Sequence, residues 1–345
     1  MRRRSPLLLI TVACCGAACL ASSSAGEGVR PVGLAAHSRG TSENVGGRGG
    51  IGVIDFRPTD GAIVASGKVA ALRVIELFSR DDGLSDVPKI GYSEGMLARG
   101  VLGAVPLEED GSVRFEVPSG VELYVQALDV RGRALFTVGP SLRLRAGETR
   151  IIVGSRCLAR GTEPAGAAST LACRKPPVRL EPESQGSYPL SFARLVQPVL
   201  DRHCIGCHDG RSGRPDLRPD LFEAGDGEEI PPRERLCGVE SLHGGWSRSY
   251  ADLKRHAWSS DGSGGVGEPG EANPTDGEAG ARASRLVQML DCGHGNCNLS
   301  ADDSHRIALW LDCDSPFYGA YHDACDQARG GLVRPRAGYL TEFEN

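Results

Sequence analysis

The sequence is poor in aromatic residues and contains no long apolar run. Aromatic side chains make up only 5% of the 345 residues, so there is little material for a large hydrophobic core. No apolar run reaches the roughly 18 residues that a membrane-spanning helix needs, which excludes the polytopic class and predicts no integral membrane domain. With 40% hydrophobic and 24% charged residues, the chain is still too apolar to be wholly disordered.

Clustered positive charge is also missing. The formal net charge is -5 at pH 7, and no basic stripe with interleaved aromatic residues occurs. A surface of this kind does not attract phosphates, so we predict no nucleic-acid partner. The chain is instead rich in glycine (47) and proline (21), which predicts several loop-rich segments.

The N-terminus has the pattern of a secretory signal. Arginines at positions 2–4 precede a short apolar run over 7–20, and small residues follow up to Ala25. We predict a signal peptide over 1–25 and a periplasmic or secreted protein, with which twelve cysteines agree. The alternatives are an N-terminal anchor helix and a lipoprotein with lipid on Cys19, although Gly16 stands where lipidation signals normally have leucine.

The first half of the mature chain changes from flexible to β-rich. Residues 26–60 are rich in Gly, Ser and Arg and predict a flexible segment. Residues 61–155 contain short β-branched runs separated by turn signals, which predicts an antiparallel β-sandwich. The expected strands cover residues 69–78, 100–106, 113–117, 121–128, 134–138 and 149–153.

The second half is predicted to be mainly helical. A Cys/Pro-rich linker over 156–187 leads into a helical domain over 188–332, which a tail over 333–345 follows. Apolar residues recur at helical spacing from Phe192, with Ser191 as N-cap and Pro198 as a kink or restart. Two further helices are expected over 281–290 and 300–312, after a Gly- and acid-rich loop over 259–280.

One motif carries specific chemistry. Cys204, Cys207 and His208 follow the first predicted helix with the C-x-x-C-H spacing of covalent haem attachment. Two thiols three residues apart on a turn can each add to one vinyl group, and the adjacent imidazole can bind iron. We therefore predict one covalent haem c with His208 as its proximal ligand. The expected fold is multidomain α+β, in which the antiparallel β-sandwich precedes a mainly α, cytochrome c-like haem domain.

Three other interpretations of the motif stay open. The two thiols could form a redox dithiol or plain disulfides. They could also form half of a zinc site that Cys292, His294 or Cys297 completes, because C-x-x-C pairs are common in zinc knuckles.

The distal side of the iron has one preferred candidate. His294 lies between glycines on a loop that joins two predicted helices, where the backbone can approach a flat ring closely. The alternative is a surface loop histidine. Met96 lies in the β-rich region, and Met289 is expected on the core face of a helix. If His294 binds, both axial ligands are imidazoles and no iron position is free for a substrate.

Seven mature cysteines remain outside the motif. Because the number is odd, at least one is unpaired or intermolecular. Plausible pairs are Cys157 with Cys173, Cys292 with Cys297, and Cys313 with Cys325. The seven residues are Cys157, Cys173, Cys237, Cys292, Cys297, Cys313 and Cys325.

Longer strings resemble a known family. The β-rich region has VLGAVPLEEDGSVRFEVPSG from Val101 and VQALD from Val125. The helical region has LVQPVLDRHCIGCHDG from Leu195, SRSY from Ser247, ARASRLVQML from Ala281, ALWLD from Ala308 and SPFYG from Ser315. These strings resemble the β-domain and the C-terminal cytochrome domain of hydrazine synthase alpha subunit-like multihaem proteins. The likeness covers roughly residues 65–325.

The resemblance also shows where this chain departs from the family. The family has a β-propeller ahead of this region and a catalytic haem attached shortly after the β-domain. Here the corresponding stretch after Cys157 has Arg160 and Gly161 in place of the second cysteine and the histidine, so the resemblance implies that this haem and its hydrazine-forming chemistry are absent. It implies an electron-transfer haem at Cys204, Cys207 and His208, with His294 as distal ligand.

The expected function is therefore electron transfer by a single-haem c-type cytochrome rather than catalysis. Its partner would be a redox protein of unknown identity, and a separate propeller-type subunit could make a hetero-oligomer. Two rival functions remain. One is a non-redox binding or structural module that docks through the β-sandwich, and the other is a five-coordinate haem enzyme that acts on a small nitrogen or oxygen compound.

Overall fold

A computed structural model describes most of the chain after residue 46. The described residues are 47–55, 68–79, 88–91, 96–153, 156–157, 167–211, 213–220, 235–236, 239–240, 246–257 and 280–335. They belong to one compact unit, Asn44–Asn345. The predicted signal peptide over 1–25, the loop over 259–279 and the tail beyond residue 335 lie outside them.

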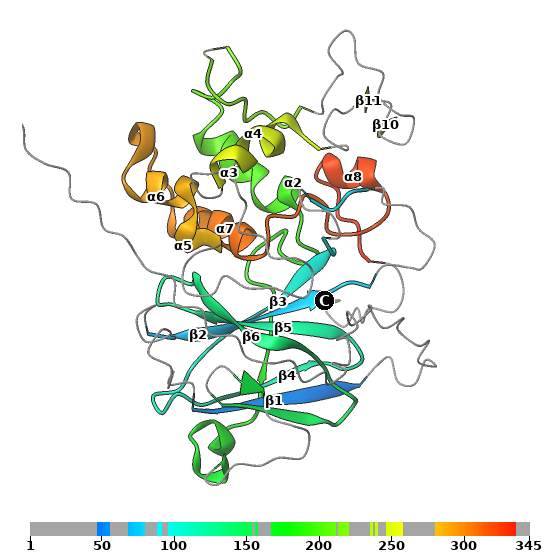
Figure 1. Ribbon diagram of the computed structural model, residues 1–345, viewed down its shortest axis with the longest axis vertical. Coiled ribbons are helices and arrows are strands. Elements are labelled where there is room, and N and C mark those ends of the chain that lie inside the picture. The colour runs from blue at the N-terminus through cyan, green and yellow to red at the C-terminus, as the bar shows by residue number, and fades with distance from the viewer. Residues whose placement is uncertain are drawn as a thin grey trace, which may run out of the picture. The chain divides into compact units, whose positions relative to one another are not determined.

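The described chain combines β-strands with helices, so the α+β class is confirmed (Figure 1). Nine strands form one sheet in the order β3-β2-β5-β6-β8-β7-β1-β4-β9. They are β1 (Arg48–Asp55), β2 (Ala71–Leu77), β3 (Arg99–Pro106), β4 (Val113–Pro118), β5 (Glu122–Leu128), β6 (Ala134–Arg143), β7 (Thr149–Val153), β8 (Arg156–Cys157) and β9 (Val178–Arg179). A separate pair joins β10 (Arg235–Leu236) to β11 (Val239–Glu240).

All six predicted strands are present, although the sheet is not purely antiparallel. The neighbours β2–β3, β2–β5 and β5–β6 are antiparallel, as are β1–β4 and β7–β8. The pairs β1–β7, β4–β9 and β6–β8 are parallel. The all-antiparallel expectation is therefore wrong for these three pairs, because β1, β8 and β9 come from segments in which the sequence predicts no strand.

Strand β1 also corrects the flexible segment predicted over residues 26–60. Its Ile51 and Val53 are buried between β4 and β7. Glycine has a low propensity for strands, so the sequence does not predict this one. The packing nevertheless requires glycine at position 49. A Cβ added to Gly49 would lie 2.9 Å from Cβ of Leu144, closer than real side chains approach. The remainder of 26–60, apart from Gly47, lies outside the described residues.

Strand β2 alternates between two cores. Leu72 and Val74 belong to the cluster inside the β region, whereas Ile75 packs with the helices. Successive residues of a strand point to opposite faces, so this part of the sheet is covered on both sides. Figure 1 shows the helices α5, α6 and α7 on one side of β2, β5 and β6, with β1 and β4 on the other.

The helical region follows the predicted pattern with more, shorter helices. Its helices are α2 (Phe192–Leu195), α3 (Gln197–His203), α4 (Arg248–Ala257), α5 (Gly280–Ala283), α6 (Arg285–Asp291), α7 (Ala301–Asp312) and α8 (Ala324–Ala328). Short 3-10 turns are η1 (Ala167–Ser169), η2 (Ala172–Arg174) and η4 (His294–Asn296).

Local capping explains several of these boundaries. The first predicted helix is split into α2 and α3, and Pro198 stands in the first turn of α3, where a missing backbone N–H costs little. Ser284 caps α6, and Ser300 caps α7 by accepting a hydrogen bond from the Asp303 backbone N–H (3.0 Å).

Aromatic side chains from distant segments fill the helical core. Phe192 and Tyr250 have ring centroids 5.2 Å apart in an edge-on arrangement, and Phe192 also lies 5.3 Å from Trp310. Helix α4, which carries Tyr250, is not among the helices predicted from the sequence. Within the described residues, aromatic side chains of α2, α4 and α7 thus meet in the core between the helices.

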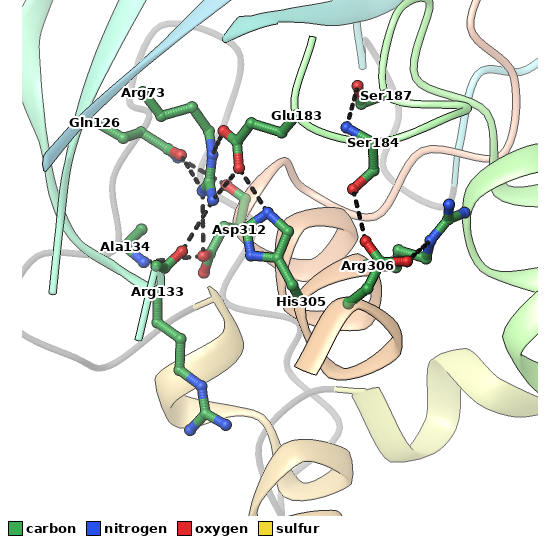
Figure 2. A network of polar contacts seen from close by, with 12 residues as sticks. Arg73, Gln126, Arg133, Ala134, Glu183, Ser184, Ser187, His305, Arg306 and Asp312 are labelled. Atoms are coloured by element: carbon green, nitrogen blue, oxygen red, sulfur yellow. Dashed lines mark hydrogen bonds and ion pairs between the residues drawn. The ribbon is translucent and has the colours of Figure 1, made fainter. Parts of the chain in front are cut away.

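A buried ion network joins the sheet to the helices (Figure 2). Nε of Arg73 on β2 lies 2.7 Å from a Glu183 oxygen, and Nη1 lies 3.4 Å from Oδ2 of Asp312 at the end of α7. Asp312 also accepts hydrogen bonds from the backbone of Ala134 (2.9 Å) and Ala281 (2.8 Å). Burial raises the pKa of Asp312. Burial would also raise the pKa of Glu183, but Arg73 and His305 outweigh it and lower that pKa to about 2.

Another buried carboxyl, Glu76 on β2, lies in a different environment. Glu76 is 1% exposed, and the hydroxyl of Tyr188 donates to its Oε2 over 2.9 Å. Its other oxygen has no hydrogen-bond partner among the described residues. Burial raises the pKa of Glu76 to about 7, against the opposing effect of the Tyr188 hydrogen bond.

Glu76 should therefore make stability fall as the pH rises from about 4.5 to about 7. Below the unfolded pKa of about 4.5 the carboxyl is neutral in both states, so it adds no pH dependence. Between that value and about 7 only the unfolded chain ionises, which removes up to about 3 kcal/mol of folding free energy. Urea unfolding of the wild type and Glu76→Gln at pH 5 and pH 8 measures the difference. If the unfolding free energies of the two proteins change equally between pH 5 and pH 8, the raised pKa of Glu76 is contradicted.

Candidate functional site

The Cys204–His208 motif occupies a tight turn at the end of α3. The Cys204 N–H closes the helix on Leu200 O (2.8 Å), and the N–H groups of Cys207 and His208 both donate to Cys204 O (3.1 and 3.0 Å). Cys204 is partly buried against the helical core, whereas Cys207 is exposed. One turn thus carries two thiols and an imidazole on a few consecutive residues.

A backbone carbonyl orients the ring of His208. Nδ1 of His208 lies 3.2 Å from Pro215 O, and the N–H of Leu217 donates to His208 O over 3.0 Å. A carbonyl only accepts hydrogen bonds, so the contact places the ring proton on Nδ1. Nε2 then presents its lone pair, as metal-binding histidines require.

Charged contacts hold the loop that supplies this carbonyl. Asp216, next to Pro215, is buried and pairs with Arg218 through two hydrogen bonds (2.9 and 2.7 Å). Its backbone N–H donates to Asp252 on α4 (2.8 Å). Hydrogen bonding by Arg218 lowers the pKa of Asp216 despite its burial, so the carboxylate stays charged.

Helix α7 supports the turn from another side. Asp303 lies near its start and is bound by Arg202 and His203, the two residues before Cys204. The backbone N–H of Asp303 donates to the cap residue Ser300, whereas its side chain serves this ion pair. Burial opposes ionisation of Asp303, but the hydrogen bond from His203 and the pairing with Arg202 lower its pKa.

His294 lies opposite His208. Helix α6 ends at Asp291, Gly293 adopts the left-handed conformation (φ 86°), and His294 opens the short η4 turn. The ring centroids of His208 and His294 are 5.9 Å apart, and their planes differ by 35°. The fold therefore brings His208 and His294, which are far apart in the sequence, close together.

The other sequence candidates for the distal position lie in other environments. Met96 is buried in the core shared by sheet and helices, and a Cβ on Gly91 would meet its sulfur. Met289 is 37% exposed, so its predicted place on the core face of a helix is wrong. It points away because Leu286 and Val287 supply the buried face of α6.

The thiol groups do not form the pairs considered from the sequence. Cys173, Cys292, Cys297 and Cys313 are free, so the three short-range disulfides are not formed. Cys313 is buried at the end of α7, and burial raises the pKa of its thiol to about 12. The side chains of Cys157 and Cys237 lie outside the described residues.

The thiol environment disfavours two alternatives for the motif. Burial, and secondarily the proximity of Cys297, raise the pKa of Cys204 to about 11. A dithiol redox centre needs a lowered thiol pKa, which is the opposite of this environment. Within the described part of the chain, no group of three or more His, Cys, Asp or Glu side chains could hold a metal ion, which gives a zinc site no support there.

Comparison with protein families agrees with the sequence resemblance. Residues 67–157 match the family model described as hydrazine synthase alpha subunit middle domain. This segment of the chain is therefore similar to the middle domain of hydrazine synthase alpha subunits. The matched segment runs from just before β2 to the end of β8 and so covers most of the sheet.

The chain was also compared with solved structures and with curated proteins. A solved structure described as Kuenenia stuttgartiensis hydrazine synthase aligns with this chain at 16% identity and a TM-score of 0.46, over 85% of this chain and 44% of that one. The present chain thus spans less than half the length of that chain. No curated protein matches the sequence. No helix in the described residues is long and apolar enough to cross a membrane.

Proposed function

We propose that this hydrazine synthase alpha-like protein is a single-haem c-type cytochrome that transfers electrons. Cys204 and Cys207 would tether the haem, and His208 and His294 would bind its iron from opposite sides. In this proposal the helices form a cytochrome c-like domain and the strands form a β-sandwich.

One observation carries the proposal. A metal–imidazole bond is about 2 Å long, and the centroid of a five-membered ring lies about 1 Å behind the ligating nitrogen. Two imidazoles on opposite sides of one metal ion therefore have centroids about 6 Å apart. The 5.9 Å between His208 and His294 fits that spacing. Because the same His208 belongs to a C-x-x-C-H turn, haem iron fits the pair better than an isolated metal ion.

The residues would act in distinct ways. Each thiol would add across one vinyl group, with sulfur bound to one carbon and hydrogen to its neighbour, so that no group leaves. Pro215 O keeps the His208 proton on Nδ1, so the Nε2 lone pair would be available to bind the iron. When bound, haem supplies a reversible one-electron Fe(III)/Fe(II) couple. Two imidazole ligands favour a lower potential than a methionine and a histidine would.

The cellular setting is part of the same proposal. The N-terminal pattern over residues 1–25 supports a periplasmic or secreted location, where covalent haem attachment takes place. The electron donor and acceptor would be redox proteins. The similarity of residues 67–157 to a domain of a hydrazine synthase alpha subunit supports association with a separate subunit, which would be of the propeller type.

His294→Ala is the variant that tests the distal ligand. We expect wild-type protein, matured with a haem-attachment system, to be six-coordinate and low-spin. The variant should convert largely to high-spin iron because one strong-field imidazole is lost. Absorption and electron paramagnetic resonance spectra of the oxidised proteins measure this change.

His322→Ala is a matched control, because that histidine pairs with Asp323 and is not part of the site. Its spectrum should equal that of the wild type. A high-spin wild-type spectrum that His294→Ala leaves unchanged would favour the five-coordinate enzyme instead. The absence of a reversible iron couple would favour the non-redox binding module.

A further inference from the structure

The loop that carries His294 is attached to the β region through a rigid turn between β5 and β6. Oδ1 of Asp129 accepts hydrogen bonds from the N–H groups of Arg131 (2.8 Å) and Arg133 (3.0 Å). The backbone closes the turn with two more bonds, Asp129 N to Arg133 O (2.9 Å) and Gly132 N to Asp129 O (3.0 Å). Gly132 has φ 74°, which glycine adopts without strain.

The turn is fixed to the interior of the molecule. Nη2 of the buried Arg73 donates to Gly132 O over 2.9 Å. Arg73 itself forms ion pairs with Glu183 and Asp312 (Figure 2). The turn between β5 and β6 is therefore a stable platform rather than a free loop.

Two arginines of this platform bind one carboxylate on α6. The guanidinium of Arg133 donates to both oxygens of Asp291 at 2.8 Å, and that of Arg131 does so at 3.2 Å. The Arg133 side chain is only 10% exposed, whereas that of Arg131 is 58% exposed. The Arg133 pair is thus the better ordered and less screened of the two.

Asp291 is the last residue of α6 and lies three positions before His294. The segment between them has little freedom. The N–H of Cys292 donates to Gln288 O (3.1 Å), and the N–H of Gly293 donates to Leu290 O (3.0 Å). The N–H of Cys297 then closes η4 on His294 O (2.8 Å). Where Asp291 is held, the His294 backbone is held as well.

We propose that Arg133 is a positioning residue for the His294 imidazole, acting through its paired hydrogen bonds to Asp291. The inference rests on the proposed function, because it treats His294 as the distal ligand. It gives the hydrazine synthase alpha-like β region a role in the haem site, since a β5–β6 turn sets how firmly an axial ligand stays in place.

The rate of carbon monoxide binding tests this inference. Carbon monoxide binds reduced iron only after the distal imidazole has left, so the observed rate reports how often His294 dissociates. We expect Arg133→Gln to raise the rate by about tenfold, within the usual range for residues that orient a metal ligand. Arg133→Lys, which keeps the charge but not the paired geometry, should give an intermediate rate.

Two further variants separate positioning from general destabilisation. Asp291→Ala removes the acceptor for both arginines and should raise the rate at least as much as Arg133→Gln. The double variant should be no faster than Asp291→Ala alone, because both changes break one interaction. Arg143→Gln is the control, since Arg143 is exposed at the opposite end of β6 and, among the described residues, donates to Gly120 O. Its rate should equal that of the wild type.

The outcomes distinguish this inference from the proposed function. If Arg133→Gln lowers the melting temperature but keeps the wild-type rate, the positioning role is overturned. The same holds if Asp291→Ala leaves the rate unchanged. A wild-type rate as fast as that of His294→Ala would instead overturn the distal assignment in the proposed function.

Discussion

Arg73→Met should cost about 3–5 kcal/mol of unfolding free energy, the usual loss when one partner of a buried ion pair is removed. Arg73 is fully buried, and its guanidinium contacts Glu183, Asp312, Gln126 and Gly132 O. Methionine has a similar apolar stem but leaves two buried carboxyl groups without their cation. Urea unfolding at pH 7 measures the loss.

A second substitution identifies the source of the cost. Because the low pKa of Glu183 depends on Arg73, adding Glu183→Gln to Arg73→Met should recover part of the stability. Arg143→Met is the exposed control and should change the unfolding free energy by less than about 1 kcal/mol. If Arg73→Met also changes the unfolding free energy by less than about 1 kcal/mol, the ion network does not stabilise the packing of the helices on the sheet.

Replacing both Cys204 and Cys207 with alanine should abolish covalent haem retention. Each thiol would supply one thioether bond, so the double variant has no covalent link even if both histidines still bind iron. Haem staining of protein separated on a denaturing gel measures the retained pigment. The double variant should give no band, and each single variant should keep a band.

Cys292→Ala is the matched control for the cysteine variants. Cys292 is an exposed free thiol two residues before His294, but it lies outside the C-x-x-C-H motif. Its haem band should equal that of the wild type. A band that survives in the double variant would mean that other residues carry the attachment.

The strands were predictable because their side chains alternate and their turns contain glycine. Val113, Phe115 and Val117 are buried in β4 while Arg114 points outward, which is the pattern that the sequence shows. Strand β1 was not predictable in this way, because four of its eight residues are Arg48, Gly49, Gly50 and Gly52. Only the partner strands show why small residues are needed there.

The contacts that support the site could not be predicted from spacing. Cys204, Cys207 and His208 form a local motif, and His294 stands out between two glycines. By contrast, Arg133 and Asp291 are 158 positions apart. No periodicity or short motif links them, because their pairing depends on how α6 packs beside the β5–β6 turn. The same reason applies to Asp303, whose partners precede Cys204 by one or two residues.

Intact-protein mass spectrometry tests the central claim most directly. The protein is matured with a haem-attachment system, denatured in acidic organic solvent and weighed. Because thioether formation adds the thiols to the vinyl groups without a leaving group, the account predicts one species with the mass of the processed chain plus one complete haem. A mass equal to that of the unmodified chain would contradict it.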